Sequence, residues 1–417
     1  MILAESWDCG WRLCYGNFNG VSVLEDAVYY ALSSYSLDTG GALFRLDLPR
    51  KGIAPSGPRM VVELPEAAGE SGQKRVPQGK IHTAIFRWKG DLLFPTHTCF
   101  YRLDGSRELV GSPPDGYLPY SGGGIFTWNE ATRRNARLGS APDAEGIIAG
   151  NFDHARSRFF GLTWPTGIFF RCDLETGDTK AFRGLSGEGE MGEGKTFFKL
   201  CRAIPICMDT GEAFFTNSEG TIYRYDPKTD DVSVVEEDSL RKDYLGNLDP
   251  HGTATMGYQW RQAIWNPGDG LIYASHIESD YLFTFDPRSR KVSFVERLAC
   301  DPMRESGMNR GAGSLGLAFS PDGERIVYIA GAGRPEPVKV LVSGGAELVN
   351  QADSYHLMTW DLKRKARTDH GPICFPDGKR PLHINSLSIA DDGTAYCLAF
   401  IPEGSGYRTD LISFKLP

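Results

Sequence analysis

The sequence contains no long apolar run: no stretch approaches the ~18 consecutive apolar residues of a membrane-spanning helix. Its first residues, Met-Ile-Leu-Ala-Glu-Ser-Trp-Asp, have neither a basic segment nor an apolar core, so they do not resemble a secretory signal. We therefore expect no membrane partner. The location we expect is cytoplasmic if the sequence is the full-length chain, and periplasmic or secreted if a signal peptide has been removed.

Metal-type cysteine pairs and basic runs interleaved with aromatic residues are also missing. None of the nine cysteines forms a C-x-x-C pair, and we interpret them as small buried side chains in a reducing compartment. There are 45 Lys and Arg against 53 Asp and Glu, a formal net charge of −8. An acidic chain without a basic patch is not expected to bind nucleic acid.

Turn-forming residues, by contrast, are plentiful, with 49 Gly and 25 Pro among 417 residues, which indicates many short strands. One pattern recurs along the chain: an apolar run, a turn with Asp or Gly, an aromatic-rich run, and an aromatic strand that ends in Asp. Its clearest copies end at Asp173, Asp226 and Asp286. Apolar residues alternate with period two, and no long helical period competes.

The pattern occurs seven times, each with three evident strands and room for a fourth. It predicts an all-β protein, a seven-bladed β-propeller of four-stranded antiparallel blades in a single domain, 1–417. A strand from residues near 11–16 is expected to complete the last blade. The alternative is a large sandwich or two stacked β-domains. The approximate blade limits are 20–62, 80–138, 145–182, 200–236, 260–296, 313–368 and 383–417.

Cationic or titratable residues occupy matched positions in several of these units. His82, Arg202 and Arg261 open the expected inner strands, and an arginine there requires a partner or an anion. The far ends of the second strands hold His97, Asn217 and His276. Because adjacent antiparallel strands bring these two sets of positions together, we expect the histidines and arginines to converge on one face.

This set of residues suits a carboxylate-bearing sugar. Two arginines bind a carboxylate, and histidines transfer protons near neutral pH. Neutralising the carboxylate of a uronate acidifies the hydrogen on the adjacent carbon, as β-elimination requires. Nearby aromatic residues are candidates for sugar contacts, the best of them in a Thr-Trp-Pro loop: Trp164, Tyr258, Trp260 and Tyr120.

Several phrases resemble the seven-bladed propeller polysaccharide lyases, that is, the ulvan lyases and rhamnose-glucuronate lyases. They lie within residues 80–300 and are Lys80-Ile-His82-Thr-Ala-Ile, Phe94-Pro-Thr-His97-Thr, Tyr120-Ser-Gly-Gly-Gly, Gly161-Leu-Thr-Trp-Pro-Thr-Gly167, Cys201-Arg202 and Trp260-Arg261. The resemblance implies a carbohydrate lyase that acts on a uronate-containing glycan without a required cofactor. It implies that His82 and His97 are the paired catalytic histidines and that Arg202 or Arg261 is the arginine.

The third blade departs from that family, which leads us to expect a tyrosine there. The candidate positions hold Ile148, Phe159, Phe160 and Trp164. Either Tyr258 or Tyr120 takes over from another loop, or a histidine acts alone, or the protein is not a lyase.

Two other function classes stay open. A non-catalytic propeller would bind an anionic glycan or a protein partner. A metal-dependent hydrolase or lactonase would hold a divalent ion such as Ca, Mn or Zn through His82, His97, His276 and His383, although no tight His-x-His spacing favours it. The sequence does not define the oligomeric state.

Overall fold

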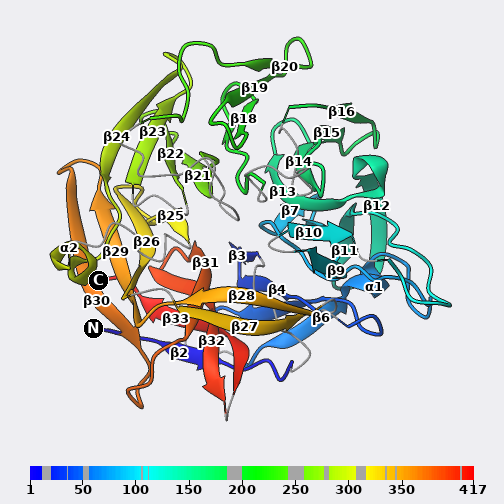
Figure 1. Ribbon diagram of the computed structural model, residues 1–417, viewed down its shortest axis with the longest axis horizontal. Helices are drawn as coiled ribbons and strands as arrows, with labels where there is room; N and C mark the ends of the chain where they lie inside the picture. The colour runs from blue at the N-terminus through cyan, green and yellow to red at the C-terminus, as the bar shows by residue number, and fades with distance from the viewer. Residues whose placement is uncertain are drawn as a thin grey trace.

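The computed structural model describes residues 1–11, 20–34, 36–49, 56–104, 107–110, 112–185, 200–242, 258–276, 281–306, 316–333, 336–342, 345–403 and 406–417. Seven antiparallel sheets are arranged radially about a central axis (Figure 1). The helices described are short: α1 (Leu64–Ala67), α2 (Asp301–Glu305) and a 3-10 turn at Pro142–Ala144. The predicted all-β, seven-bladed propeller of four-stranded blades is confirmed. Within the described residues, no helix has the length and apolar character that crossing a bilayer requires.

Most blades are built from strands that follow one another in the chain from the axis outward. In blades one to four these are β3 (Val21–Leu24), β4 (Ala27–Leu32), β5 (Ala42–Asp47), β6 (Arg59–Glu63); β7 (Phe86–Trp88), β8 (Asp91–Pro95), β11 (Gly124–Asn129), β12 (Arg134–Ser140); β13 (Gly146–Asp153), β14 (Arg158–Trp164), β15 (Phe169–Asp173), β16 (Thr179–Phe182); and β17 (Ile206–Cys207), β18 (Glu212–Thr216), β19 (Ile222–Asp226), β20 (Asp231–Val234).

Blade five follows the same order, whereas blades six and seven each add a strand from the N-terminal segment. In blades five to seven the strands are β21 (Gln262–Trp265), β22 (Ile272–Ser275), β23 (Tyr281–Asp286), β24 (Lys291–Arg297); β25 (Leu317–Phe319), β26 (Arg325–Ala332), β29 (Ser354–Asp361), β30 (Ala366–Cys374), β1 (Ile2–Leu3); and β31 (His383–Ile389), β32 (Thr394–Glu403), β33 (Gly406–Lys415), β2 (Glu5–Trp7).

The repeated aspartate at the end of the third strand forms a turn in blades three and four. The Asp173 carboxylate accepts hydrogen bonds from the backbone N–H groups of Glu175 and Thr176, both at 3.0 Å. Asp226 accepts the N–H of Lys228 at 2.9 Å, the same arrangement one blade later. An Asp side chain that bonds its own backbone two residues on closes a tight turn, so the motif marks the passage from the third to the fourth strand.

The core lies between neighbouring blades, where aromatic side chains stack across the junctions. Phe169 of blade three and Phe215 of blade four are stacked with ring centroids 4.2 Å apart. Phe160 and Tyr225 meet at the same junction, 4.9 Å apart. Stacked and tilted aromatic pairs add to the burial of apolar area and so stabilise the junction of blades three and four.

The N-terminal segment joins two blades. β2 pairs antiparallel with β33 as the outer strand of blade seven, and β1 pairs parallel with β30 of blade six. The closing strand is therefore Glu5–Trp7 and not the predicted segment near 11–16, of which only Trp11 lies within the described residues. Glu5 and Ser6 are exposed, so this strand carries little of the apolar alternation by which strands are recognised.

Two hairpins are inserted into the blades. One, β9 (Tyr101–Asp104) with β10 (Arg107–Val110), interrupts blade two, and the other, β27 (Glu336–Val342) with β28 (Gly345–Gln351), interrupts blade six. β28 contacts β9, so the two insertions meet. Blade six extends to Cys374, beyond the predicted limit of 368, because β30 runs from Ala366 to Cys374.

Candidate axial binding site

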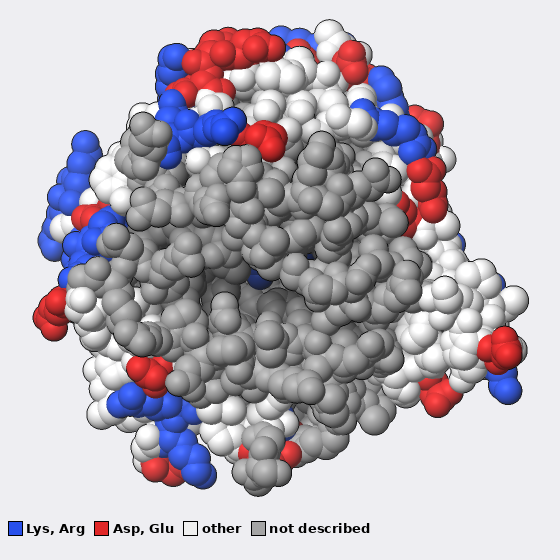
Figure 2. All heavy atoms as spheres, viewed as in Figure 1, with Lys and Arg blue, Asp and Glu red and all other residues white. Residues whose placement is uncertain are grey.

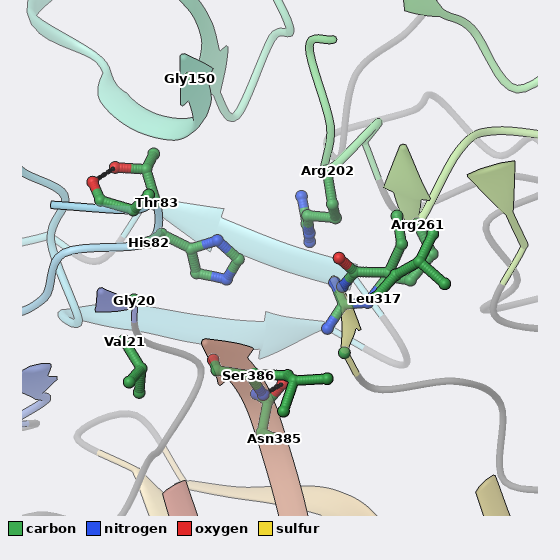
Figure 3. Close-up of a pocket in the computed structure, with 14 residues that line it drawn as sticks. Gly20, Val21, His82, Thr83, Gly150, Arg202, Arg261, Leu317, Asn385 and Ser386 are labelled. Atoms are coloured by element: carbon green, nitrogen blue, oxygen red, sulfur yellow. Dashed lines mark hydrogen bonds between the residues drawn. The ribbon is translucent and has the colours of Figure 1, made fainter. Parts of the chain in front are cut away.

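A cavity of about 210 Å³ lies on the propeller axis and is lined by all seven blades. Its side chains come from residues within or just before the inner strands (Figure 3). Figure 2 views the molecule in the same direction as Figure 1 and shows a hollow at its centre, with Lys or Arg atoms visible inside it. One lining residue from each blade, in order, is Val21, His82, Gly150, Arg202, Arg261, Leu317 and Asn385.

The structure brings together three of the four residues predicted to be catalytic. His82, Arg202 and Arg261 line the cavity from blades two, four and five. All three precede the first residue of their inner strand, which begins at Phe86, Ile206 and Gln262 respectively. They therefore lie on the segments that lead into the blades.

Backbone hydrogen bonds hold these segments in place. The N–H of Arg261 donates to the carbonyl of Ser275 at 2.9 Å, and that of Arg202 to the carbonyl of Trp260 at 3.1 Å. Next to His82, Lys80 forms an antiparallel bridge with His97, with N–H···O distances of 3.0 and 2.8 Å. Each channel side chain thus projects from a segment whose backbone is hydrogen-bonded to a neighbouring segment.

The cavity is electropositive. Its described lining includes Arg202, Arg261 and His82 and contains no aspartate or glutamate. Burial holds the pKa of His82 well below its usual range, and the positive charges of Lys80 and Arg202, with His97 and Arg261, lower it further. The His82 imidazole is therefore neutral at pH 7, although the guanidinium groups beside it are charged. The net negative charge of the chain does not alter this local field.

His97 lies behind His82 rather than on the cavity surface. Their ring centroids are 6.3 Å apart, and His97 is 1% exposed. The Trp164 ring packs on His97 at 5.0 Å and is also 1% exposed. Trp164, the predicted sugar platform, is thus a packing partner of His97 in this structure. Gly146 permits this packing, because a Cβ there would lie 2.8 Å from Nδ1 of His97.

The other predicted aromatic contacts lie away from the described cavity lining. Trp260 is fully buried among the apolar residues between blades four and five. Tyr258 is half-buried, with its ring 6.5 Å from that of His276. Tyr120 donates its hydroxyl hydrogen to Oε1 of Gln78 at 2.9 Å, and burial raises its pKa well above the usual value.

His276 and Asn217 follow their second strands as expected, and both are buried. Asn217 accepts backbone N–H bonds from Glu219 and Thr221 at 3.1 and 3.0 Å, so it closes a turn. His276 is fully buried against Phe283, at 5.0 Å, and burial lowers its pKa to about 3. Its ring nitrogens have no hydrogen-bond partner among the described residues.

Blade three contributes Gly150 to the cavity. The four positions at which the lyase family led us to expect polar groups are core residues, each 1% exposed or less: Ile148, Phe159, Phe160 and Trp164. No hydroxyl from these positions reaches the axis, and a Cβ on Gly150 would lie 2.4 Å from the Phe159 ring.

Asn385 and Ser386 of blade seven also line the cavity. A register shift between Asn385 and Ser388 interrupts β31, and Ser386 adopts a φ of 64° with its N–H bonded to Oδ1 of Asn385. Such a bulge redirects side chains. The sequence placed Ile384 or Asn385 at this position, and strand alternation alone does not reveal the bulge that selects Asn385.

The histidines considered as metal ligands are not assembled as a group of three in the described part of the chain. The group of His, Cys and carboxylate side chains whose ligand atoms come within 4.8 Å of one another there is Cys300, His356 and Asp369. Eight of the nine cysteines are described, none of them in a disulfide, and seven are buried.

No family model matches the chain, and no curated protein matches it. Among solved structures, the Cps50 (Swd1) β-propeller domain of Myceliophteria thermophila is similar, with a TM-score of 0.53, 9% identity, and coverage of 99% of this chain and 98% of that one. The RRP9 WD40 repeats are also similar, with a TM-score of 0.53 and 8% identity. The match covers 99% of this chain and 97% of that one.

The extracellular domain of a one-component system of B. thetaiotaomicron is also similar, with a TM-score of 0.51 and 10% identity. The match covers 98% of this chain but only 39% of that one. At such identities the similarity shows the fold alone. The chain is thus a seven-bladed β-propeller with an electropositive axial cavity.

Proposed function

We propose that the axial cavity binds a carboxylate-bearing ligand, the terminal uronate of an acidic oligosaccharide. The observation that carries this is the placement of Arg202 and Arg261 on one cavity around His82, in a described lining without an acidic residue. Guanidinium groups bind carboxylates through paired, charge-assisted hydrogen bonds. The volume of about 210 Å³ is below the ~300–1,000 Å³ of most ligand pockets, which favours a single sugar ring entering end-on.

Because His82 is neutral, it can act as a base toward the bound sugar ring, and the reaction that this favours is β-elimination. The arginines neutralise the carboxylate, and His82 removes the proton from the adjacent carbon. The electron pair of that C–H bond forms a C=C bond to the next ring carbon. At the same time the bond between that next carbon and the glycosidic oxygen it carries breaks. His82, now protonated, returns the proton to the departing oxygen, so one histidine serves as base and then acid without water or a cofactor.

Calorimetric titration of glucuronate, with glucose as the neutral comparison, tests the binding. We expect glucuronate alone to bind, and Arg202→Gln and Arg261→Gln each to weaken binding at least ten-fold. A charged hydrogen bond contributes about 1.5–3 kcal/mol, and about 1.4 kcal/mol corresponds to a factor of ten. Arg364→Gln is the matched control, because its side chain is 83% exposed on the outer turn of blade six. Equal binding of both sugars, or of neither, would contradict the proposal.

The reaction is tested separately by the ultraviolet absorbance of the unsaturated uronate product, with ulvan, gum-arabic and pectin oligosaccharides as substrates. An increase that His82→Gln abolishes while glucuronate binding persists supports elimination. Binding without any increase in absorbance would identify a non-catalytic glycan-binding propeller.

A further inference from the structure

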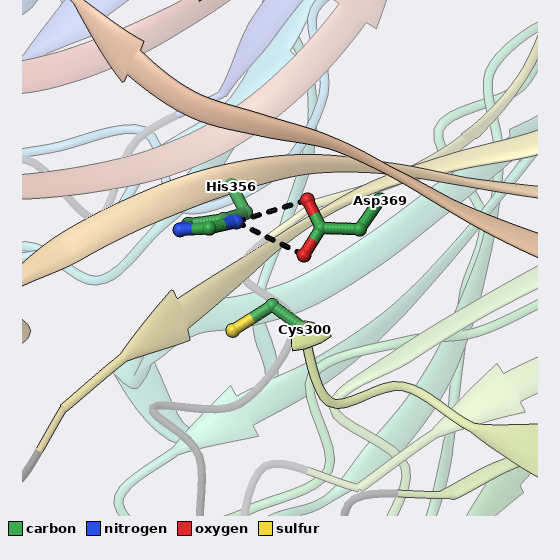
Figure 4. Close-up of side chains that lie close together, drawn as sticks. All are labelled: Cys300, His356 and Asp369. Carbon is green, nitrogen blue, oxygen red and sulfur yellow. Dashed lines mark hydrogen bonds and ion pairs between the residues drawn. The ribbon is translucent and has the colours of Figure 1, made fainter. Parts of the chain in front are cut away.

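A second cluster of reactive side chains lies at the junction of blades five and six. Cys300 follows β24 at the start of α2, His356 lies on β29, and Asp369 lies on the neighbouring strand β30 (Figure 4). None of the three lines the axial cavity. The cluster is buried: Cys300 is 0% exposed, His356 6%, and the Asp369 side chain 4%.

The three side chains converge closely. Nδ1 of His356 is 2.9 and 3.0 Å from the two carboxylate oxygens of Asp369. One ligand atom from each residue, including Sγ of Cys300, lies within 4.8 Å of the other two. Figure 4 shows the Asp369 carboxylate facing one nitrogen of the His356 ring, with the Cys300 side chain lying beside both residues.

The carboxylate is oriented by its own set of backbone donors. The N–H of Asp301 donates to one oxygen of Asp369 and that of Gly371 to the other, both at 2.8 Å. Although burial by itself would raise it, these bonds and the one from His356 lower the pKa of Asp369 to about 2. The residue is therefore ionised at neutral pH, and donors of this kind are what orients a metal-binding carboxylate.

We propose that Cys300, His356 and Asp369 form a binding site for a divalent transition metal of the zinc class. Imidazole nitrogen, thiolate sulfur and carboxylate oxygen are the ligands that zinc takes from proteins, at bond lengths of about 2.0–2.3 Å. A thiolate and a carboxylate together cancel the 2+ charge, which a buried site requires. The ion displaces the thiol proton of Cys300, which is released to solvent, and binds the unprotonated nitrogen of the neutral His356 imidazole; no electron is transferred.

Such an ion would connect the segment after β24 to the paired strands β29 and β30 of blade six. It would stabilise the folded chain, because a site that brings Cys300 to the β29–β30 pair does not exist in the unfolded state. The alternative is a hydrogen-bonded His–Asp pair beside a thiol, without affinity for metals. This proposal is independent of the function assigned to the axial cavity.

The test uses the full chain, stripped with a chelator and titrated with Co²⁺. We expect one equivalent to bind with a thiolate-to-cobalt charge-transfer band, and Zn²⁺ to displace it. Cys300→Ser should abolish the band, and Asp369→Asn should weaken Co²⁺ binding at least ten-fold. Cys397→Ser is the matched control, since Cys397 is equally buried but lies on β32 of blade seven.

A second measurement does not depend on the folding of any variant. Zn²⁺ should raise the Tm of the stripped wild-type chain, whereas Mg²⁺ at the same concentration should not. The proposal is overturned if the wild type binds no stoichiometric Co²⁺, if Zn²⁺ leaves its Tm unchanged, or if Cys300→Ser retains the charge-transfer band.

Discussion

The backbone N–H of Arg202 donates a hydrogen bond of 3.1 Å to the carbonyl of Trp260, the residue that precedes Arg261. The bond ties the inner segment of blade four to that of blade five. It places two guanidinium groups from separate blades on one cavity, which neither blade could form alone. The indole of Trp260 is fully buried behind this bond, so the apolar core between the blades also sets the spacing of the charges.

The ionisation of His82 should respond to a bound anion. Burial and the cationic neighbours hold its pKa well below the usual value in the unliganded protein. A carboxylate between Arg202 and Arg261 adds a negative charge beside the ring, so the pKa should rise on binding. NMR titration of the histidine resonances with and without glucuronate, with His82→Gln for assignment, measures the change. A pKa that is unaffected by glucuronate would place the anion elsewhere.

His276 should make the fold sensitive to acid. Its pKa is lowered to about 3 by burial, against about 6.5 in an unfolded chain. Below pH 6.5 the imidazole is protonated in the unfolded state but stays neutral in the folded state. The free energy of unfolding therefore falls as the pH is lowered from 6.5 to about 3. The total loss is several kcal/mol, at ~1.4 kcal/mol per pKa unit. His276→Phe should reduce the pH dependence of the free energy of unfolding over this interval. Equal slopes for variant and wild type in urea titrations at pH 7, 5 and 4 would show that His276 does not cause it.

Gly146→Ala should destabilise the protein through His97. The new Cβ would lie 2.8 Å from Nδ1 and 3.0 Å from Cγ of that ring, which is itself packed against Trp164. Overpacking of this kind costs about 1–3 kcal/mol, measurable by denaturant unfolding. Gly57→Ala is the control, because a Cβ there meets nothing within 4 Å. Similar effects for both substitutions would mean that His97 has room to move.

Removal of residues 1–7 should lower the stability of the whole propeller. The deletion takes away β2, the outer strand of blade seven, and β1, which joins blade six. It also removes the 2.9 Å hydrogen bond from the Trp7 indole to Ser413 and exposes the edge of β33. Removal of Met1 alone, which is 76% exposed, is the control. Equal unfolding midpoints for the two truncated chains would show that ring closure does not depend on this segment.

Much of the fold could be predicted because the repeat has a local physical cause. Asp173 and Asp226 close turns through their own neighbouring N–H groups, so each leaves a mark at a fixed place in the sequence. The matched positions of His82, Arg202 and Arg261 follow from the same repetition. The closing strand at Glu5–Trp7 was missed because it is short and its first two residues are exposed.

The sequence by itself determined the number of blades and the cationic or titratable residues that precede the inner strands of blades two, four and five. Period-two alternation and Asp turns are properties of short segments, which is why the sequence carries them. Only the tertiary structure decided which side chains reach the axis. Trp164 and His97 pack on each other behind the cavity, whereas Asn385 reaches it through a bulge. The tertiary structure also decided that Cys300 lies beside His356 and Asp369. Their proximity depends on how blades five and six stack, and no local sequence pattern records it.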